Sequence, residues 1–279
     1  MRRFIHLPAA VLATAMLASP VQAALLVDYN FNEGSGASVA NSGTLGSAAN
    51  GTLTGTWSAN TPSGTGSSVK FTGTNANEGV TTGSVVAGLN GLNQITGLLW
   101  LNLTAAPAAG DRLISNQSTL TNGFDFSIFS ASSGNFTVAL NTDAVTGSAS
   151  NSISQNLNSW MFLAFTYDGT QTTNNVQFYI GTTTGGVAAL GSAKSQNAGA
   201  LGTSVNPFEV ANTAQSTSDR TPAALFDNVQ IYDTVLSLSE LEAVRVATSA
   251  IPEPATWGLL TLAGTLVLLR RRRNAAAAR

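Results

Sequence analysis

Two apolar runs decide the fold of this chain: Trp160-Met161-Phe162-Leu163-Ala164-Phe165-Thr166-Tyr167-Asp168-Gly169 and Val176-Gln177-Phe178-Tyr179-Ile180-Gly181. Both are rich in aromatic and β-branched residues, which are enriched in strands. The connection from Asp168-Gly169 to Asn174-Asn175 is polar and is typical of a hairpin loop. We therefore expect two antiparallel strands here.

Short apolar runs of the same kind recur along the chain, between segments of Ser, Thr, Asn, Gly and Ala. They predict strands at residues 25–31, 69–71, 98–103, 112–116, 124–129, 136–141, 161–167, 176–180, 208–210 and 225–232. So many strands without interleaved long helices predict an all-β, antiparallel sandwich. Residues 32–68 and 181–206, which are poor in aromatic residues, are expected to form long loops or frayed edge strands; the alternative is a low-complexity, disordered tract.

One short helix is predicted after the last strand. Ser237-Leu238-Ser239-Glu240 has the S-x-x-E form of a capping box. Leu238, Leu241 and Val244 then recur at helical spacing. This helix is expected to cover an edge or one end of the sandwich.

Four blocks resemble, in the expected order, the concanavalin A-like, laminin-G-like domains of bacterial secreted proteins. They are residues 28–36, the Trp100 strand at 95–103, the hairpin at 160–181, and residues 226–241. The resemblance implies a jelly-roll β-sandwich. It also implies a calcium ion at one rim and a glycan site on loops or on a concave face.

The chain opens with a pattern typical of a secretory signal peptide. Arg2-Arg3 precede an apolar stretch from about Leu7 to Ala18, and Val21-Gln22-Ala23 fits a cleavage site of small residues. We expect residues 1–23 to be removed and residues 24–250 to form the exported domain.

Residues 251–279 combine a Pro-Glu-Pro motif, an uncharged apolar run at 255–269 and a basic cluster. This order resembles the PEP-CTERM sorting signal, which an exosortase processes. The motif residues are Pro252, Glu253, Pro254, Arg270, Arg271, Arg272 and Arg273. The resemblance implies export to the envelope, surface or extracellular matrix of a Gram-negative bacterium, and a link to exopolysaccharide. Before processing, the helix at 255–269 would contact the membrane; an anchor that is never cut is the alternative.

Residues 24–250 are acidic and lack several reactive side chains. They hold five basic residues against thirteen acidic ones, which are the 14 of the chain less Glu253. Nucleic acid is therefore not an expected partner, because phosphate contacts need Lys and Arg. The chain has no cysteine, and its one histidine, His6, lies in the signal peptide. A Ser-His-Asp triad and a Cys/His metal site are excluded.

Oxygen ligands for calcium are nevertheless present. The candidates are Asp227, Asp28, Asn77, Glu78 and Asn228. Asp227 is the preferred one, since the resemblance implies an acidic residue in the closing strand. The alternative is that Asp227 only accepts backbone hydrogen bonds at a strand edge.

Trp57 lies in the loop-rich segment 52–60 and is the candidate glycan contact, because no predicted strand includes it. It could equally be a loop anchor packed on the sandwich.

No predicted strand carries the closely spaced carboxylate pair of a glycosidase. We therefore expect a non-catalytic protein that binds carbohydrate or exopolysaccharide. The alternatives are a purely structural matrix component and, less favoured, a glycosidase or polysaccharide lyase.

Overall fold

The computed structural model describes residues 23–249, apart from residues 75–77, 120–121, 133, 143–148, 155 and 217. Residues 1–22 of the expected signal peptide and the whole expected sorting segment 251–279 lie outside the described residues. The expected helix at 255–269 lies there too. Within the described part of the chain, no helix is long and apolar enough to cross a membrane.

Two antiparallel sheets form the domain, as predicted. The first sheet contains, in order, β14 (Ala188–Lys194), β13 (Val176–Thr182), β12 (Met161–Asp168), β7 (Gln94–Leu103), β16 (Ala224–Tyr232), β5 (Ser68–Phe71) and β4 (Thr56–Ser58), with β1 (Leu25–Tyr29) paired to β16. The second sheet contains β11 (Ala149–Ser154), β10 (Asn135–Asn141), β9 (Asp125–Ser132), β8 (Arg112–Ser115), β15 (Glu209–Val210), β6 (Gly79–Thr81), β3 (Gly51–Thr54) and β2 (Ser38–Val39). Short 3₁₀ helices span Gly46–Ala49 and Ala87–Leu89.

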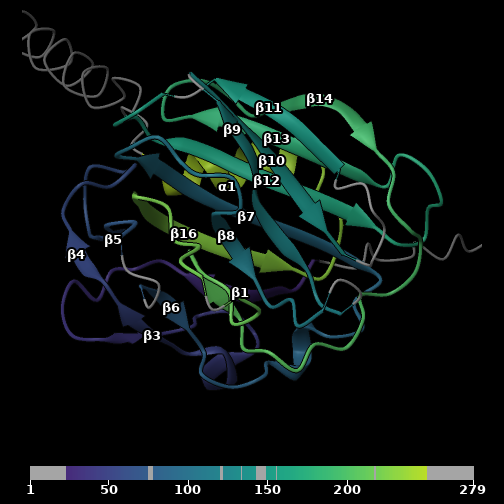
Figure 1. Ribbon diagram of the computed structural model, residues 1–279, viewed down its shortest axis with the longest axis horizontal. Helices are drawn as coiled ribbons and strands as arrows, with labels where there is room; N and C mark the ends of the chain where they lie inside the picture. The colour runs from purple at the N-terminus through teal and green to yellow at the C-terminus, as the bar shows by residue number, and fades with distance from the viewer. Residues whose placement is uncertain are drawn as a thin grey trace, which may run out of the picture.

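The sheets face each other across an apolar core. In Figure 1, β8 and β9 cross in front of β7 and β12, and helix α1 (Leu238–Thr248) lies behind them. The predicted hairpin is confirmed, since β12 pairs with β13 with Phe165 opposite Phe178. From the second sheet, Phe126 meets Phe165 with ring centroids 5.0 Å apart and stacks on Phe178 at 6.0 Å. Aromatic pairs of this kind supply much of the burial energy of a sandwich.

A second apolar cluster covers the outer face of the first sheet, under α1. Trp100 is fully buried there and packs edge-on against Phe162, with ring centroids 5.4 Å apart. Its indole N–H donates to the Thr248 hydroxyl in the last turn of α1 at 2.8 Å. Trp160 belongs to the same cluster, and its indole N–H donates to Asn60 Oδ1 at 3.0 Å. Both tryptophans are therefore buried in the cluster between the first sheet and α1.

Helix α1 begins as predicted. The Ser237 hydroxyl accepts a hydrogen bond from the Glu240 N–H, and the Glu240 carboxylate accepts one from the Ser237 N–H. Leu241 is buried, but Leu238 is 46% exposed, so it does not belong to the apolar stripe. Arg245 is buried instead, paired with Glu242 at 2.7 Å.

The weakly apolar segments form mostly edge strands. Residues 32–68 supply β2 and β4 at sheet edges, and residues 181–206 supply β14 at the opposite edge of the first sheet. Residues 32–68 also supply β3, which pairs with both β6 and β2, so the expectation of loops or edge strands is wrong for β3. Strands β6 and β11 were not predicted, because their sequences, GVT and ASNSIS, carry few large apolar residues. Backbone pairing, with neighbouring strands supplying the core, decides their structure.

Candidate functional site

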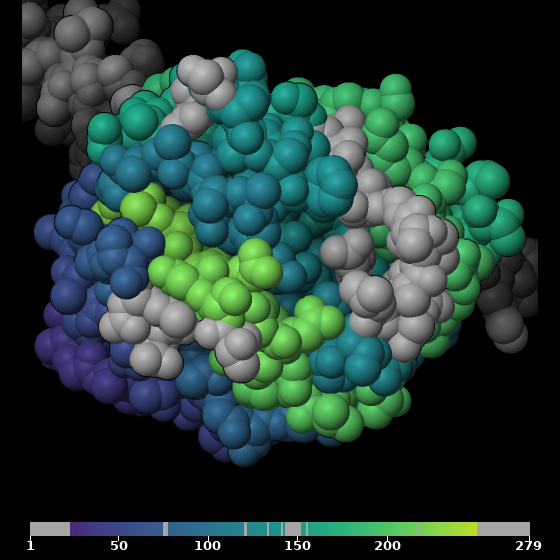
Figure 2. Space-filling model, in the orientation of Figure 1, coloured from purple at the N-terminus to yellow at the C-terminus, as the bar shows by residue number. Residues whose placement is uncertain are grey.

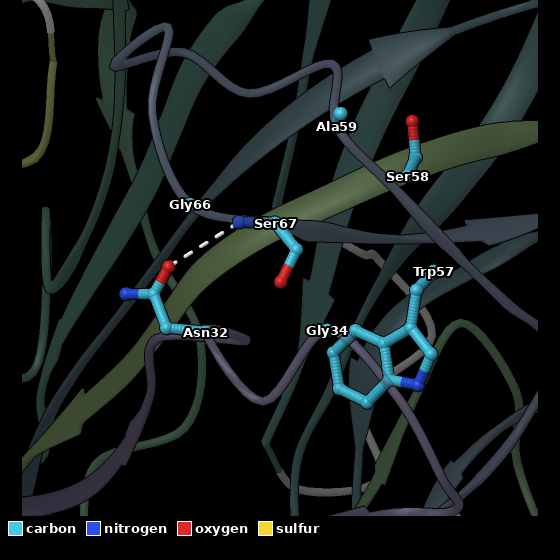
Figure 3. A pocket seen from close by; sticks show the side chains of 7 residues that line it. All are labelled: Asn32, Gly34, Trp57, Ser58, Ala59, Gly66 and Ser67. Atoms are coloured by element: carbon cyan, nitrogen blue, oxygen red, sulfur yellow. Dashed lines mark hydrogen bonds between the residues drawn. The ribbon is translucent and has the colours of Figure 1, made fainter.

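Two adjoining hollows lie beside β4 and the end of α1. The larger has a volume of ≈ 450 Å³, and its lining consists of Asn32, Gly34, Trp57, Ser58, Ala59, Gly66 and Ser67 (Figure 3). The smaller has a volume of ≈ 230 Å³, and its lining consists of Asn30, Asn32, Ser63, Thr65, Gly66, Asp227, Asn228, Ala247 and Thr248. Asn32 and Gly66 line both hollows, and we call the two hollows together the trough. Trp57 is in register with Val69 and Phe226, so Asp227, the next residue along β16, points to the opposite face of the sheet.

Trp57 forms one wall of the trough. It lies on edge strand β4 opposite Val69, and its half-buried ring packs against the main core. The indole N–H donates to Gly36 O at 2.8 Å, which fixes the ring plane. Figure 3 shows the ring beside Gly34, with Ser67 and Asn32 further along the cleft. Trp57 is therefore anchored on the sandwich and also borders the trough.

The connection between β4 and β5 forms another wall and is held by its own hydrogen bonds. The Thr61 and Ser63 hydroxyls both donate to Thr65 O, at 2.9 and 2.8 Å. Gly66 has a φ of +79°, and a Cβ atom there would collide with Asn32 Oδ1. A glycine is thus required where the loop meets Asn32.

Asp227 lies at the inner end of the trough. A β-bulge interrupts β16 between Asp227 and Gln230, and Asn228 has a φ of 47°. The Asp227 side chain is only 2% exposed, and its Oδ1 accepts a hydrogen bond from the Asn228 N–H at 2.8 Å. Burial raises the pKa of Asp227 to about 8, against the opposing effect of that hydrogen bond. At neutral pH the buried carboxyl therefore mostly keeps its proton.

The other calcium candidates do not line the trough. Asp28, on β1, accepts hydrogen bonds from Gln230 Nε2 at 3.0 Å and from the Ser42 hydroxyl at 2.9 Å. Glu78 is buried and accepts from the Thr72 N–H at 2.6 Å, so it closes a turn after β5. Asn77 lies outside the described residues. Of the five candidates, Asp227 and Asn228 are the two that the structure brings to one cleft.

The residues around Asp227 are of types that can ligate a hard cation such as calcium, but they bring little negative charge to the site. Asn30, Asn32 and Asn228 join Asp227 in the lining of the smaller hollow. Calcium accepts such ligands, but its affinity is lower where fewer of them are carboxylates. No group of three His, Cys, Asp or Glu residues gathers at one place in the described ranges.

A charged cluster on the second sheet was not predicted. Arg112 on β8 pairs with the buried Asp125 on β9 at 2.9 Å. Next to it, burial above all, with a smaller contribution from the nearby Asp219, raises the pKa of Asp111 to about 6. The segment between β15 and β16, green in Figure 2, lies along β8, where the Arg112 N–H donates to Arg220 O at 2.7 Å. Strong internal pairing gives this cluster a structural role.

A family profile with the description Concanavalin A-like lectin/glucanases superfamily (Laminin_G_3) matches residues 72–242 of the chain. No curated protein sequence matches it. Among solved structures, domain 4 of AbnA, a GH43 extracellular arabinanase from Geobacillus stearothermophilus in complex with arabinotriose, has a TM-score of 0.56 at 16% identity. That match covers 80% of this chain and 98% of the domain.

Two further solved structures have the same fold. The binding domain of botulinum neurotoxin serotype G has a TM-score of 0.53 at 13% identity, covering 79% of this chain and 50% of that one. A Trypanosoma rangeli sialidase in complex with 2,3-difluorosialic acid has a TM-score of 0.53 at 11% identity, covering 80% of this chain and 33% of the sialidase. At such low identity these likenesses concern the fold alone.

Proposed function

The chain belongs to the concanavalin A-like lectin/glucanase superfamily, and from this membership and the trough we propose that it is a non-catalytic, polysaccharide-binding protein. The observation that carries the proposal is the position of Trp57. Its ring borders an open cleft whose other walls are amides, hydroxyls and glycines. The fold also occurs in an arabinanase domain solved with arabinotriose, so it can accommodate a glycan.

The chemistry of the cleft suits a sugar. An aromatic side chain offers a rigid apolar surface for the C–H groups of a sugar ring. Asn, Ser and Thr side chains donate and accept hydrogen bonds, as sugar hydroxyls require. Glycosidases use two carboxyl groups at the scissile bond, whereas the described lining of the trough has one, that of Asp227. This difference supports a binding role over a catalytic one.

Replacing Trp57 with alanine is expected to weaken binding to the producing organism's exopolysaccharide by about 10-fold, since truncating a central aromatic contact typically costs more than 1 kcal/mol. Affinity electrophoresis in gels that contain the polysaccharide measures the effect. Phe129→Ala is the matched control, because Phe129 is 56% exposed but lies on β9 of the second sheet. Equal retention of Trp57→Ala and the native protein would contradict the proposed site. No retention of the native protein would leave the structural matrix role.

Calcium belongs to the proposal as an accessory ion. Asp227 and Asn228 would hold it, with neighbouring side-chain oxygens completing the shell. Its role would be to order the inner end of the trough.

We also propose export through the signal peptide at residues 1–23. The Ala24 N–H donates to Asp233 Oδ1 at 2.9 Å. Cleavage after Ala23 would turn this nitrogen into a charged amine facing a carboxylate, which is a stabilising arrangement. This geometry supports a mature chain that begins at Ala24.

For the C-terminal segment we propose sorting by an exosortase-type enzyme at Pro252-Glu253-Pro254. The run at 255–269 would enter the membrane while the four arginines remain in the cytoplasm. Replacing Arg270 to Arg273 with glutamine is expected to abolish processing or to misorient the tail. Cell fractionation and the mass of the released protein measure this. Arg279→Gln is the control for a single lost charge, and unchanged location and mass in the fourfold variant would contradict the sorting proposal.

A further inference from the structure

The chain leaves the sandwich at the rim of the smaller hollow. Ala247 and Thr248, in the last turn of α1, line this hollow together with residues of the β4–β5 connection and of β16. Ser249 ends the helix in an extended conformation, with a ψ of 154°. Its hydroxyl is buried yet has no hydrogen-bond partner among the described residues, and such a group is costly unless neighbouring chain pairs with it. The segment 250–254, which lies outside the described residues, therefore starts within reach of the hollow.

The sequence of this segment, Ala250-Ile251-Pro252-Glu253-Pro254, favours an extended strand. Each proline fixes its own φ and disfavours a helical conformation of the residue before it. A strand of this kind is close to polyproline II, whose backbone groups have no internal hydrogen bonds. The two prolines also have no N–H to donate. The segment therefore brings more acceptors than donors and needs donors from its surroundings.

Two amides of the smaller hollow supply such donors. Asn30 Oδ1 accepts the Asn32 N–H at 3.1 Å, and Asn32 Oδ1 accepts the Ser67 N–H at 3.3 Å. Figure 3 shows the Asn32 amide nitrogen on the side away from Ser67. Neither Nδ2 atom donates to another of the described residues. Because the oxygens of both amides are already used, the hollow offers their N–H groups, which suit carbonyl oxygens.

The carboxyl of Asp227, at the inner end of the hollow, does not oppose an acceptor-rich strand. Burial raises the pKa of Asp227, so at neutral pH the group mostly keeps its proton. A protonated carboxyl can donate a hydrogen bond to a carbonyl oxygen. Asp227 is also the one carboxyl in the described lining, so Glu253 would meet no ionised acid there.

We propose that residues 250–254 of this chain dock in the smaller hollow as an extended strand, and that docking shields the Pro-Glu-Pro motif from processing. The connection favours this contact, because a segment joined to the rim has a high effective concentration at the hollow. Docking does not depend on glycan binding at Trp57. Only its effect on processing rests on the proposed sorting function.

An engineered disulfide tests the docking, since the chain has no cysteine of its own. Thr65→Cys places one thiol in the lining of the hollow. Ile251→Cys places the other on the segment and leaves Pro-Glu-Pro intact. The full chain is purified in detergent and oxidised with a chelator present, so that no cation occupies the hollow. Mass spectrometry and gel mobility then measure how fast the bond forms.

The control pair combines Ile251→Cys with Ala243→Cys. Ala243 is exposed on α1 and does not line the hollow, and it lies only about 8 Å from Thr248 along the helix axis. We expect the Thr65 pair to form its disulfide about 10-fold faster than this control. Equal rates, or a faster control, would overturn docking in the hollow. A disulfide between two chains would replace the chain's own segment with that of a second copy.

A variant that fills the hollow tests the shielding. Thr65 is exposed on its loop, so Thr65→Trp should displace the segment without disturbing the core. In a pulse–chase in the producing organism, we expect it to be processed about 3-fold faster than the native chain, because more of the segment is free. Ala243→Trp should match the native rate. An unchanged rate in Thr65→Trp would overturn the shielding. No processing of any chain would overturn the sorting proposal and the shielding together, while the disulfide still decides the docking.

Discussion

Replacing Trp100 with alanine is expected to lower the free energy of unfolding by about 3–5 kcal/mol, the usual cost of removing a large buried aromatic side chain. Trp100 is fully buried between the first sheet and α1, and it packs edge-on against Phe162. Its indole N–H also holds the Thr248 hydroxyl at 2.8 Å. The truncation would therefore open a cavity and release the last turn of α1 together.

Urea unfolding of the purified protein measures this effect. Trp100→Phe is the control, because it keeps most of the apolar contact while removing the hydrogen bond to Thr248 and part of the ring volume; we expect it to cost less. A loss of stability below about 1 kcal/mol would mean that the cluster under α1 contributes little to the fold.

The second large effect concerns Asp227 and pH. Burial raises the pKa of Asp227 from 3.8 to about 8 in the folded protein. Between these values the folded protein retains a proton that the unfolded chain releases, so this group makes the protein less stable as the pH rises from 4 to 8. Asp227→Asn removes the titration while keeping an oxygen for the Asn228 N–H.

The variant is therefore expected to match the native protein near pH 4 and to exceed its stability at pH 8 by on the order of 2–5 kcal/mol. Urea unfolding across this range gives the comparison. Asp111, whose pKa burial also raises, titrates in both proteins and cancels in the difference. A constant difference between the two proteins at all pH values would show that Asp227 does not titrate in this range.

The same variant tests the calcium ligand. A cation needs the ionised carboxylate, so calcium should raise the melting temperature of the native protein more at pH 8 than at pH 6. In Asp227→Asn this shift should vanish, while Asp28→Asn, a change outside the trough, should keep it. A shift that persists in Asp227→Asn would place the ion elsewhere, and no shift in the native protein would remove calcium from the proposal.

Local sequence patterns were enough to predict the elements that depend on neighbouring residues alone. The hairpin of β12 and β13 follows from its aromatic and β-branched runs, and the start of α1 follows from Ser237 and Glu240. It was harder to predict which side chains of a strand enter the core between the sheets and which enter the cluster under α1. Every residue from Met161 to Tyr167 is buried, because α1 covers the outer face of the sheet. The strand therefore lacks the alternation of apolar and polar residues that would show which side chains face which cluster.

The trough could not be predicted in the same way, because it assembles from distant segments. Trp57 and Asp227 were each recognised as candidates, but their places in the two hollows depend on the pairing of β16 with β5 and of β5 with β4. The bulge at Asp227 has no sequence signal either, since Asn228 adopts a positive φ where a glycine would be the usual indication. The polar side chains of the connection at 59–67 are typical of any surface loop, so they did not indicate a wall of the trough.

The place of β16 in the first sheet has a mechanical consequence. This last strand of the domain pairs with β7 on one side and with β1 and β5 on the other. Tension on the chain beyond α1 would first strain the helix and then load β16 in shear, with hydrogen bonds on both sides resisting at once. A final strand at the edge would instead unzip bond by bond. A domain of this topology is suited to bearing load between a bound polymer and whatever its C-terminal end is fixed to.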